Sequence, residues 1–288
     1  MIAITAATGH LGRLVVKCLL TRTDARQIAA VVRNPAKAAD LARQGVVVRQ
    51  ADYADPMALE KALVGVEKLL LISSNEIGRR FLQHLNVIEA ARRTNVKLLV
   101  YTSILRADTT PLGLGPEHLQ TEEALRASGG PFVILRNGWY SENYTASVGA
   151  ALANGAFVGS AGNGRISSAA RADFAAAAVS ALLGGAKTGQ IFELAGDQSY
   201  TLAEFAAELS RQTGKSIPYR DLPEAEYRAI LLKAGLPESL ATGLASWDVG
   251  ASRGALFDDS HHLSQLIGRA TTPIGESIRQ ALTSRSSS

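Results

Sequence analysis

The sequence predicts an α/β protein in which a doubly wound parallel sheet is followed by a smaller α+β lobe. Short apolar runs alternate with helical patterns through the first 136 residues, and this alternation is typical of right-handed crossovers between parallel strands. Beyond residue 136 the alternation loosens, and glycine and proline interrupt the helical stretches more often. We therefore expect a first domain over residues 1–136 and a smaller lobe over 137–288, with a segment at about 165–196 that returns to the first sheet.

The first domain contains six apolar runs that we expect to be strands. These runs cover residues 2–5, 28–32, 46–48, 69–72, 98–101 and 132–135. The fourth run is apolar at every position, which is typical of a central strand covered on both faces. Helical spacing follows each of the first five runs. Pro35 and Pro56 stand where two of these helices begin, a position that suits proline because its missing N–H breaks no helical bond.

The second part of the chain gives weaker signals. The expected elements are helices over residues 146–153 and 173–183, strands over 191–194 and 217–219, and a hairpin that joins strands 157–160 and 165–168. Thr201 and Glu204 have the spacing of a capping box, which predicts that a helix begins there. After Pro223 we expect mostly short helices.

Composition and spacing exclude several kinds of site and partner. The 30 basic and 26 acidic residues give a net charge of only +4 without a basic run, so we expect no nucleic-acid partner. No apolar stretch reaches the length of a membrane span. The single cysteine, Cys18, excludes a cysteine metal cage and suits the reducing cytoplasm. His261 and His262 are adjacent and do not share a helix face, so we expect no metal site.

The turn between the first strand and the first helix has the composition of a phosphate-binding loop. It runs from Thr5 through Gly9 to Gly12, and a helix begins at about Leu11. Strand, glycine turn and helix in this order bring backbone N–H groups and the positive end of a helix dipole together, which favours a bound pyrophosphate in a Rossmann-type domain. Ala6 stands where this turn usually has its first glycine. Its methyl group either weakens cofactor binding or is accommodated by a small backbone shift.

The residue that ends the second strand distinguishes between two dinucleotides. An acidic side chain there hydrogen-bonds the ribose hydroxyls of NAD, whereas an arginine pairs with the 2′-phosphate of NADP. The chain has Arg33 at this position. The alternative is an ordinary surface charge, but the location favours an NADP(H) site.

Ligands of a doubly wound sheet bind beyond the carboxyl ends of its strands. We therefore expect the site to be lined by the turn after Thr5 and by residues 33–34, 52–53, 73–75, 102–103 and 137–138.

Four stretches together resemble the NmrA-like group of atypical short-chain dehydrogenases. They are residues 5–12, 32–35, 135–143 and 171–173. The Arg-Asn-Gly-Trp-Tyr-Ser-Glu-Asn sequence at 136–143 is much more specific than the glycine turn, and the resemblance extends to about Ile274. Within this group, the chain looks most similar to the bacterial NAD(P)H:quinone oxidoreductases of type 2.

The resemblance implies a Rossmann domain that binds NADPH, a lobe that shapes a pocket for a small-molecule quinone, and direct hydride transfer without a flavin. It also implies which residues contact the cofactor, in addition to Ala6 in the turn. These are Thr8, Gly9, His10, Leu11 and Arg33 at the phosphates and adenosine, Ser73, Ser74 and Asn75 near the ribose and nicotinamide, and Asn137, Gly138, Trp139, Tyr140, Ser141, Glu142, Arg171 and Asp173 near the nicotinamide and substrate.

The usual proton-donating pair of short-chain dehydrogenases is missing. That pair is Tyr-x-x-x-Lys, but Tyr101 is followed by Leu105 at the position of the lysine. We consider Tyr140, Asn143 and His118 as catalytic donors, with a solvent-facing helix start as the alternative for His118. A quinone demands little of a general acid, because the hydroquinone anion is stabilised by its ring and takes a proton from water.

Two other functions stay open from the sequence. NmrA-like relatives include redox sensors that bind the dinucleotide without chemistry, which suits the missing Tyr-x-x-x-Lys pair. The second alternative is a reductase or isomerase of another carbonyl compound. The oligomeric state is also open, a homodimer included.

Overall fold

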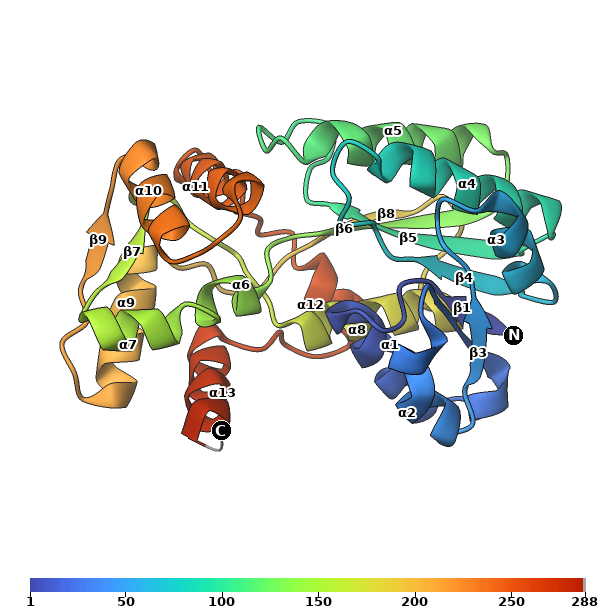
Figure 1. The fold of residues 1–288 in the computed structure, drawn as a ribbon, viewed down its shortest axis with the longest axis horizontal. Helices are drawn as coiled ribbons and strands as arrows, with labels where there is room; N and C mark the ends of the chain where they lie inside the picture. The colour runs from blue at the N-terminus through green and yellow to red at the C-terminus, as the bar shows by residue number, and fades with distance from the viewer. Residues whose placement is uncertain (287–288) are drawn as a thin grey trace.

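The computed structural model describes residues 1–286 and contains a seven-stranded sheet, drawn at the right of Figure 1. Its strands are β1 (Ile2–Ile4), β2 (Ile28–Val32), β3 (Val47–Gln50), β4 (Lys68–Leu71), β5 (Leu98–Ile104), β6 (Phe132–Asn137) and β8 (Ile191–Leu194). They lie in the order β3-β2-β1-β4-β5-β6-β8, and all neighbouring pairs are parallel. The predicted fold class is therefore confirmed, and the strand order reverses between β1 and β4.

Helices cover both faces of this sheet (Figure 1). One face carries α3 (Pro56–Leu63), α4 (Arg80–Arg93) and α5 (Gly115–Ala127), and the other carries α1 (His10–Leu20), α2 (Ala39–Arg43), α8 (Arg171–Ser180) and α12 (His262–Ile267). Short turns of 3-10 helix occupy Ala25–Gln27 and Pro35–Ala38, and a π-helical turn, Ala181–Gly185, extends α8. The inner strands β1 and β2 are consequently apolar and buried at every position.

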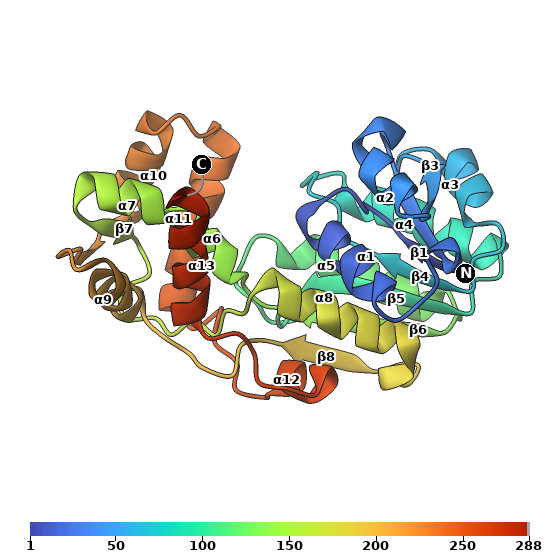
Figure 2. The same cartoon turned by 90° about the horizontal axis from the view of Figure 1, so that it is seen from below.

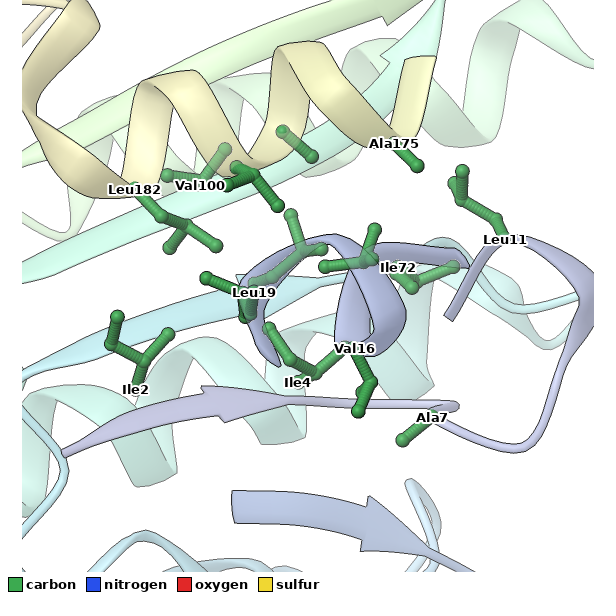
Figure 3. Close-up of a cluster of buried hydrophobic side chains, with 14 of the residues drawn as sticks. Ile2, Ile4, Ala7, Leu11, Val16, Leu19, Ile72, Val100, Ala175 and Leu182 are labelled. Carbon is green, nitrogen blue, oxygen red and sulfur yellow. The ribbon is translucent and has the colours of Figure 1, made fainter. Parts of the chain in front are cut away.

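The packing of α1 fixes where the site lies. Leu11, Val15 and Leu19 recur at the spacing of one helix face and are buried in the core that α1 forms with α8 and the sheet (Figure 3). Ala175 and the other alanines of α8 present small side chains, so the two helices approach closely. This packing holds the N-terminal end of α1 directly beyond the carboxyl end of β1.

A second lobe follows β6 and lies beside the sheet domain, with α6 between the two parts (Figure 2). It contains a two-stranded parallel sheet of β7 (Phe157–Gly159) and β9 (Tyr219–Asp221). Its helices are α6 (Ser141–Thr145), α7 (Val148–Asn154), α9 (Leu202–Thr213), α10 (Glu224–Lys233), α11 (Glu238–Ser252) and α13 (Ile274–Ser286). Phe157 and Phe205, whose ring centroids are 4.7 Å apart, lie in its apolar core. Within residues 1–286, no helix combines the length and apolar character that a membrane crossing requires.

The hairpin predicted around residues 161–164 is wrong. β7 pairs in parallel with β9 instead, and residues 165–168 form no strand. Ile166 exchanges backbone hydrogen bonds with Tyr200, and the Ser167 N–H donates to the Leu256 carbonyl, so distant parts of the chain hold this segment. A glycine turn shows where a chain reverses, but it does not determine which strand edge the next segment meets.

Other boundaries moved by smaller amounts. The strand predicted at 217–219 lies at Tyr219–Asp221, and the helix predicted at 173–183 begins at Arg171 and continues into the π-helical turn. The fifth strand extends to Ile104 because it pairs with β6 as far as Asn137. Helix α6 was not anticipated.

Candidate functional site

A pocket of about 440 Å³ lies at the carboxyl ends of the strands, where the strand order reverses. Four segments line it: the turn after β1, the end of β2, the residues that follow β3, and the loop after β4 with Gln83 of α4. Of the residues implicated by the sequence, the pocket is lined by Ala6, Thr8, Gly9, His10, Leu11, Arg33, Ser73, Ser74 and Asn75. The fold therefore gathers the candidates for the phosphates and adenosine, at the ends of β1 and β2, and those for the ribose and nicotinamide, after β4, around one pocket.

The turn after β1 brings the backbone close to the pocket. A Cβ atom on Gly12 would overlap the Ala6 carbonyl oxygen and lie 2.7 Å from Ala7 Cα, so this position requires glycine. Helix α1 begins without a side-chain cap and without an acidic residue in its first turn. Its N-terminal N–H groups are therefore available to an anion, and the residues present fit a pyrophosphate.

Ala6 occupies the left-handed region of the backbone, with a φ of 47°. Glycine adopts this conformation without strain, whereas a Cβ atom costs about 1–2 kcal/mol there. The turn thus keeps the conformation that a glycine would have, and the alanine bears the strain. Whether this methyl group weakens cofactor binding or is accommodated by a small backbone shift stays a prediction.

Tyr53 lines the pocket and is held in place by hydrogen bonds. Its hydroxyl lies 2.5 Å from Thr5 Oγ1 and 2.7 Å from the Ile72 carbonyl oxygen. Thr5 Oγ1 also donates to the Leu70 carbonyl and accepts from the Ile72 N–H. Burial raises the pKa of Tyr53, so its hydroxyl stays neutral and these contacts do not change with pH.

The adenosine end of the pocket carries charges of both signs. Arg33 and Lys37 line it, and Arg33 Nη1 lies 3.1 Å from Glu76 Oε1. The guanidinium side chain is 64% exposed, which leaves it accessible to a ligand. An arginine and a lysine at one end of a dinucleotide pocket suit a 2′-phosphate.

A buried hydrogen-bond network holds the loop after β4 from behind. The Ser74 N–H donates to His84 Nε2 at 2.8 Å, and His84 Nδ1 lies 3.0 Å from Thr121 Oγ1. Because Thr121 donates its own proton to the Glu117 carbonyl, Nδ1 must carry the histidine proton. Burial, and then the charge of Arg80, lowers the pKa of His84 to about 3, so the ring stays neutral.

A second cluster lies where β6 passes into α6. The Glu142 carboxylate accepts from the Arg171 N–H at 3.0 and 3.1 Å and so caps α8. Arg171 Nη2 donates to Asn143 Oδ1 at 3.1 Å, and its guanidinium lies 4.8 Å from the centroid of the Tyr140 ring. Burial raises the pKa of Tyr140, while the Asn137 amide and Arg171 oppose this shift. The cluster therefore contains a neutral phenol beside a cation.

The remaining residues of this stretch pack more tightly. A Cβ atom on Gly138 would lie 2.8 Å from the Leu194 carbonyl oxygen. Ser141 Oγ lies 2.9 Å from Ser168 Oγ, and both residues are buried. Trp139 meets the lobe through Trp247, with ring centroids 5.7 Å apart in an edge-to-face arrangement.

Two candidates lie away from both the pocket and the cluster at α6, whose residues do not line the pocket themselves. His118 is buried, with Nδ1 2.7 Å from the Tyr101 hydroxyl, and burial lowers its pKa well below the usual value. The alternative of a solvent-facing His118 is therefore wrong. Asp173 is fully buried and accepts from Arg269 Nη2 at 2.6 Å and from the Thr272 N–H at 2.8 Å. These contacts tie the C-terminal segment to α8.

Several residues around the pocket were not predicted from the sequence. Lys37, Glu76 and Gln83 line it, and His84 supports it. Lys37 follows Arg33 by four residues, and that spacing was a usable signal. Glu76 and Gln83 gave none, because their meaning depends on which strand ends the fold brings together.

Comparison with known proteins gives the family. The model of a family described as NAD(P)H-binding matches residues 6–183, more than half of the chain. The chain belongs to the NAD(P)H-binding family. The match begins at the turn after β1 and ends just after α8, so it contains the whole pocket.

Relatives from three organisms place the chain within this family. Quinone oxidoreductase 2 of Escherichia coli is 56% identical over 96% of this chain and 97% of that protein. The crystal structure of the NADPH-dependent quinone oxidoreductase from the same organism, complexed with NADPH, has a TM-score of 0.95 and covers 98% of this chain and 100% of that one.

A Citrobacter triphenylmethane reductase complexed with NADP(H) has a TM-score of 0.94 at 38% identity and covers 98% of this chain and 100% of that one. An NmrA-like family oxidoreductase of Aspergillus flavus is 27% identical over 97% of this chain and 94% of that protein. The resemblance to NmrA-like dehydrogenases and to bacterial quinone oxidoreductases is therefore confirmed.

Proposed function

We propose that this protein reduces quinones to hydroquinones with NADPH, by direct two-electron hydride transfer and without a flavin. One observation carries the proposal: the chain is 56% identical, over nearly the whole length of both proteins, to a quinone oxidoreductase. The pocket where the strand order reverses supports it, because the turn after β1 suits a pyrophosphate and the end of β2 suits a 2′-phosphate. When bound, NADPH supplies the hydride.

Residues 1–136 together with about 165–196 form the cofactor domain in this proposal, and the rest forms the substrate lobe. The first turn of α1 holds the pyrophosphate, and Arg33 and Lys37 hold the 2′-phosphate. The loop after β4, held through Ser74 by His84, orients the ribose and nicotinamide. This loop is preorganised because its backbone is hydrogen-bonded from behind before any ligand arrives.

The quinone is proposed to bind against the Asn137–Asn143 stretch, under the lobe. Asn137 Oδ1 and Trp139 Nε1 are both buried without a hydrogen-bond partner among the described residues. A buried acceptor and a buried donor without partners are costly unless a ligand satisfies them. Trp139 and Trp247 provide flat apolar surface for a ring, and together these groups suit a planar molecule with carbonyl oxygens.

Tyr140 is the proposed proton donor. Its hydroxyl is neutral at working pH, because burial raises its pKa, and the Arg171 guanidinium over its ring stabilises a phenolate that forms when the proton leaves. Asn143 holds that guanidinium through Oδ1. His118 is assigned a supporting role beneath the sheet, since its ring contacts Tyr101 and lies outside the pocket lining.

The location proposed is the cytoplasm, where NADPH and reduced thiols occur together. The chain has one cysteine, Cys18, which forms no disulfide.

The test is quinone-dependent oxidation of NADPH by flavin-free protein, with a simple benzoquinone as acceptor. We expect turnover with wild-type protein. Exchanging Arg33 for Ala should raise the KM for NADPH by about tenfold or more and leave the KM for NADH nearly unchanged, because charge-assisted bonds to a phosphate are worth about 1.5–3 kcal/mol. Tight NADPH binding without quinone-dependent turnover rejects the reaction, and equal effects on both cofactors reject the role of Arg33.

A further inference from the structure

The adenosine end of the pocket contains a carboxylate that the proposed reaction does not use. Glu76 Oε1 lies 3.1 Å from Arg33 Nη1, so an ion pair connects the end of β2 to the loop after β4. Both residues line the pocket. Arg33 is the group assigned to the 2′-phosphate, which carries about two negative charges. A phosphate bound to Arg33 therefore meets an anion that is already paired with the same guanidinium.

Glu76 is held where it is by other contacts. Gln83 Nε2 donates to Glu76 Oε2 at 2.9 Å, and the Glu76 N–H donates to Ser74 Oγ at 3.1 Å. Arg79 Nη1 lies 3.6 Å from the same carboxylate, and only 32% of the Glu76 side chain is exposed. Rotation of the carboxylate away from Arg33 breaks the bond to Gln83. The negative charge consequently stays near the pocket when a ligand enters.

The other acid that lines this end of the pocket is differently engaged. Asp52 Oδ1 accepts from the Ala54 N–H at 2.8 Å, a local turn contact. Of the two acids, Glu76 is therefore the one whose carboxylate is paired with Arg33.

We propose that Glu76 sets the cofactor preference by competing with the 2′-phosphate for Arg33. This inference rests on the proposed function. Binding of NADPH exchanges the Glu76–Arg33 pair for a phosphate–Arg33 pair and leaves a carboxylate beside the phosphate, which lowers the affinity. Binding of NADH leaves the pair intact, and the carboxylate is free to accept from a ribose hydroxyl. Glu76 thereby reduces the ratio of NADPH to NADH affinity. An acid at the end of β2 has a similar effect in NAD-specific domains.

The test compares Glu76→Gln with wild type in direct binding of NADP⁺ and NAD⁺, without quinone. The amide keeps the size of the side chain and its contact with Gln83 but removes the charge. We expect NADP⁺ to bind about fivefold more tightly to the variant, the size of effect that an exposed ion pair gives. The affinity for NAD⁺ should stay the same or fall.

Glu89→Gln is the matched control. Glu89 lies on α4, after the loop that contains Glu76, and pairs with Arg92 at 2.9 Å, but it is not part of the pocket lining, so neither affinity should change. An unchanged ratio of NADP⁺ to NAD⁺ affinity in Glu76→Gln overturns the inference, whether or not quinones are reduced. Failure of wild-type protein to bind either dinucleotide overturns both the inference and the proposed function. Binding without quinone turnover rejects the reaction alone.

Discussion

The cofactor pocket and the substrate lobe differ in how completely their buried polar groups are paired. Behind the pocket, Ser74, His84 and Thr121 each find partners in one neutral chain. From the end of β6 onward the pairing is less complete. In the part of the chain that the structure describes, the buried side-chain atoms there without a hydrogen-bond partner are Asn137 Oδ1, Trp139 Nε1, Ser160 Oγ and Ser277 Oγ, together with His262 Nδ1 on α12, which covers the main sheet. Before the end of β6 the one such atom is Arg80 Nη1, which lies 3.7 Å from Glu117 Oε2 in an ion pair.

This difference indicates two kinds of binding surface. A pocket whose supporting groups are already hydrogen-bonded is preorganised for one ligand, so little order is lost when that ligand binds. A surface that keeps buried donors and acceptors free gains from ligands that satisfy them. We infer that the cofactor site is rigid and suits a single ligand. The site of the electron acceptor keeps free donors and acceptors, so it can satisfy more than one ligand.

The largest effect is a loss of stability, which we expect from a substitution at the border between the two regions. Arg136 is 6% exposed and donates from Nε and Nη2 to the fully buried Glu122, at 2.9 and 2.8 Å. Exchanging Arg136 for Met leaves that carboxylate without its main partner and should lower the free energy of unfolding by about 3–5 kcal/mol in chemical denaturation. Arg126→Met is the control, since Arg126 contacts the same carboxylate from a 40% exposed position and should cost below about 1 kcal/mol. Similar losses in both variants would contradict the assignment.

The next prediction concerns the substrate side. Tyr140→Phe should lower kcat with a benzoquinone by about tenfold, because the proton donor is lost and the hydroquinone anion must take its proton from water. The KM for NADPH should stay nearly constant, because the ring remains in place beside the cofactor. His118→Gln should keep kcat within about twofold in folded protein, since His118 lies against Tyr101. A large loss of kcat in His118→Gln with little loss in Tyr140→Phe would identify His118 as the proton donor and contradict the proposed role of Tyr140.

The lobe also contains a buried carboxyl group that lowers the stability of the folded protein when it is ionised. Asp248 accepts from the Ser160 N–H at 3.0 Å, and burial raises the pKa of its carboxyl to about 6. Between about pH 4 and 6 the folded protein therefore binds more protons than the unfolded chain, and this group makes stability fall as the pH rises. Asp248→Asn should raise the free energy of unfolding by up to about 3 kcal/mol well above pH 6 and give little gain near pH 4. A gain that is the same at both pH values would reject the shifted carboxyl.

The smallest effect belongs to the strained turn of the pocket. Ala6→Gly should stabilise the protein by about 0.5–1 kcal/mol, because glycine adopts a positive φ without strain. NADPH binding should be unchanged or tighter. Ala7→Gly next to it, where the alanine is buried at an ordinary φ, should destabilise by about 1 kcal/mol. Clearly weaker NADPH binding by Ala6→Gly would mean that the proposed way in which this turn holds the cofactor is wrong.

The two regions also differ in how far sequence alone predicts them. The order of strands, the turn at Thr5–Gly12 and the position of Arg33 depend on local periodicity and on the handedness of crossovers, and both can be read from the chain. Glu76 and His84 escaped prediction because their roles depend on side chains that three strand ends and two helices bring together.

The lobe resisted prediction for a related reason. β7 pairs with β9, about sixty residues later, and the pairing is decided by which edge is available in three dimensions. The burial of His118 follows from its contact with Tyr101, a strand residue that points to the same face as α5. Turn signals and helix starts carry no information on such contacts.

The central claim is direct hydride transfer from NADPH to a quinone, and one measurement tests it most directly. Flavin-free protein is mixed with a benzoquinone and either NADPH or NADPH deuterated at the transferred position, and the loss of reduced nicotinamide is followed by its absorbance. We expect one hydroquinone for each NADPH consumed, and slower oxidation of the deuterated cofactor from one face of the ring only. Quinone-independent oxidation, or turnover that requires added flavin, would contradict the account.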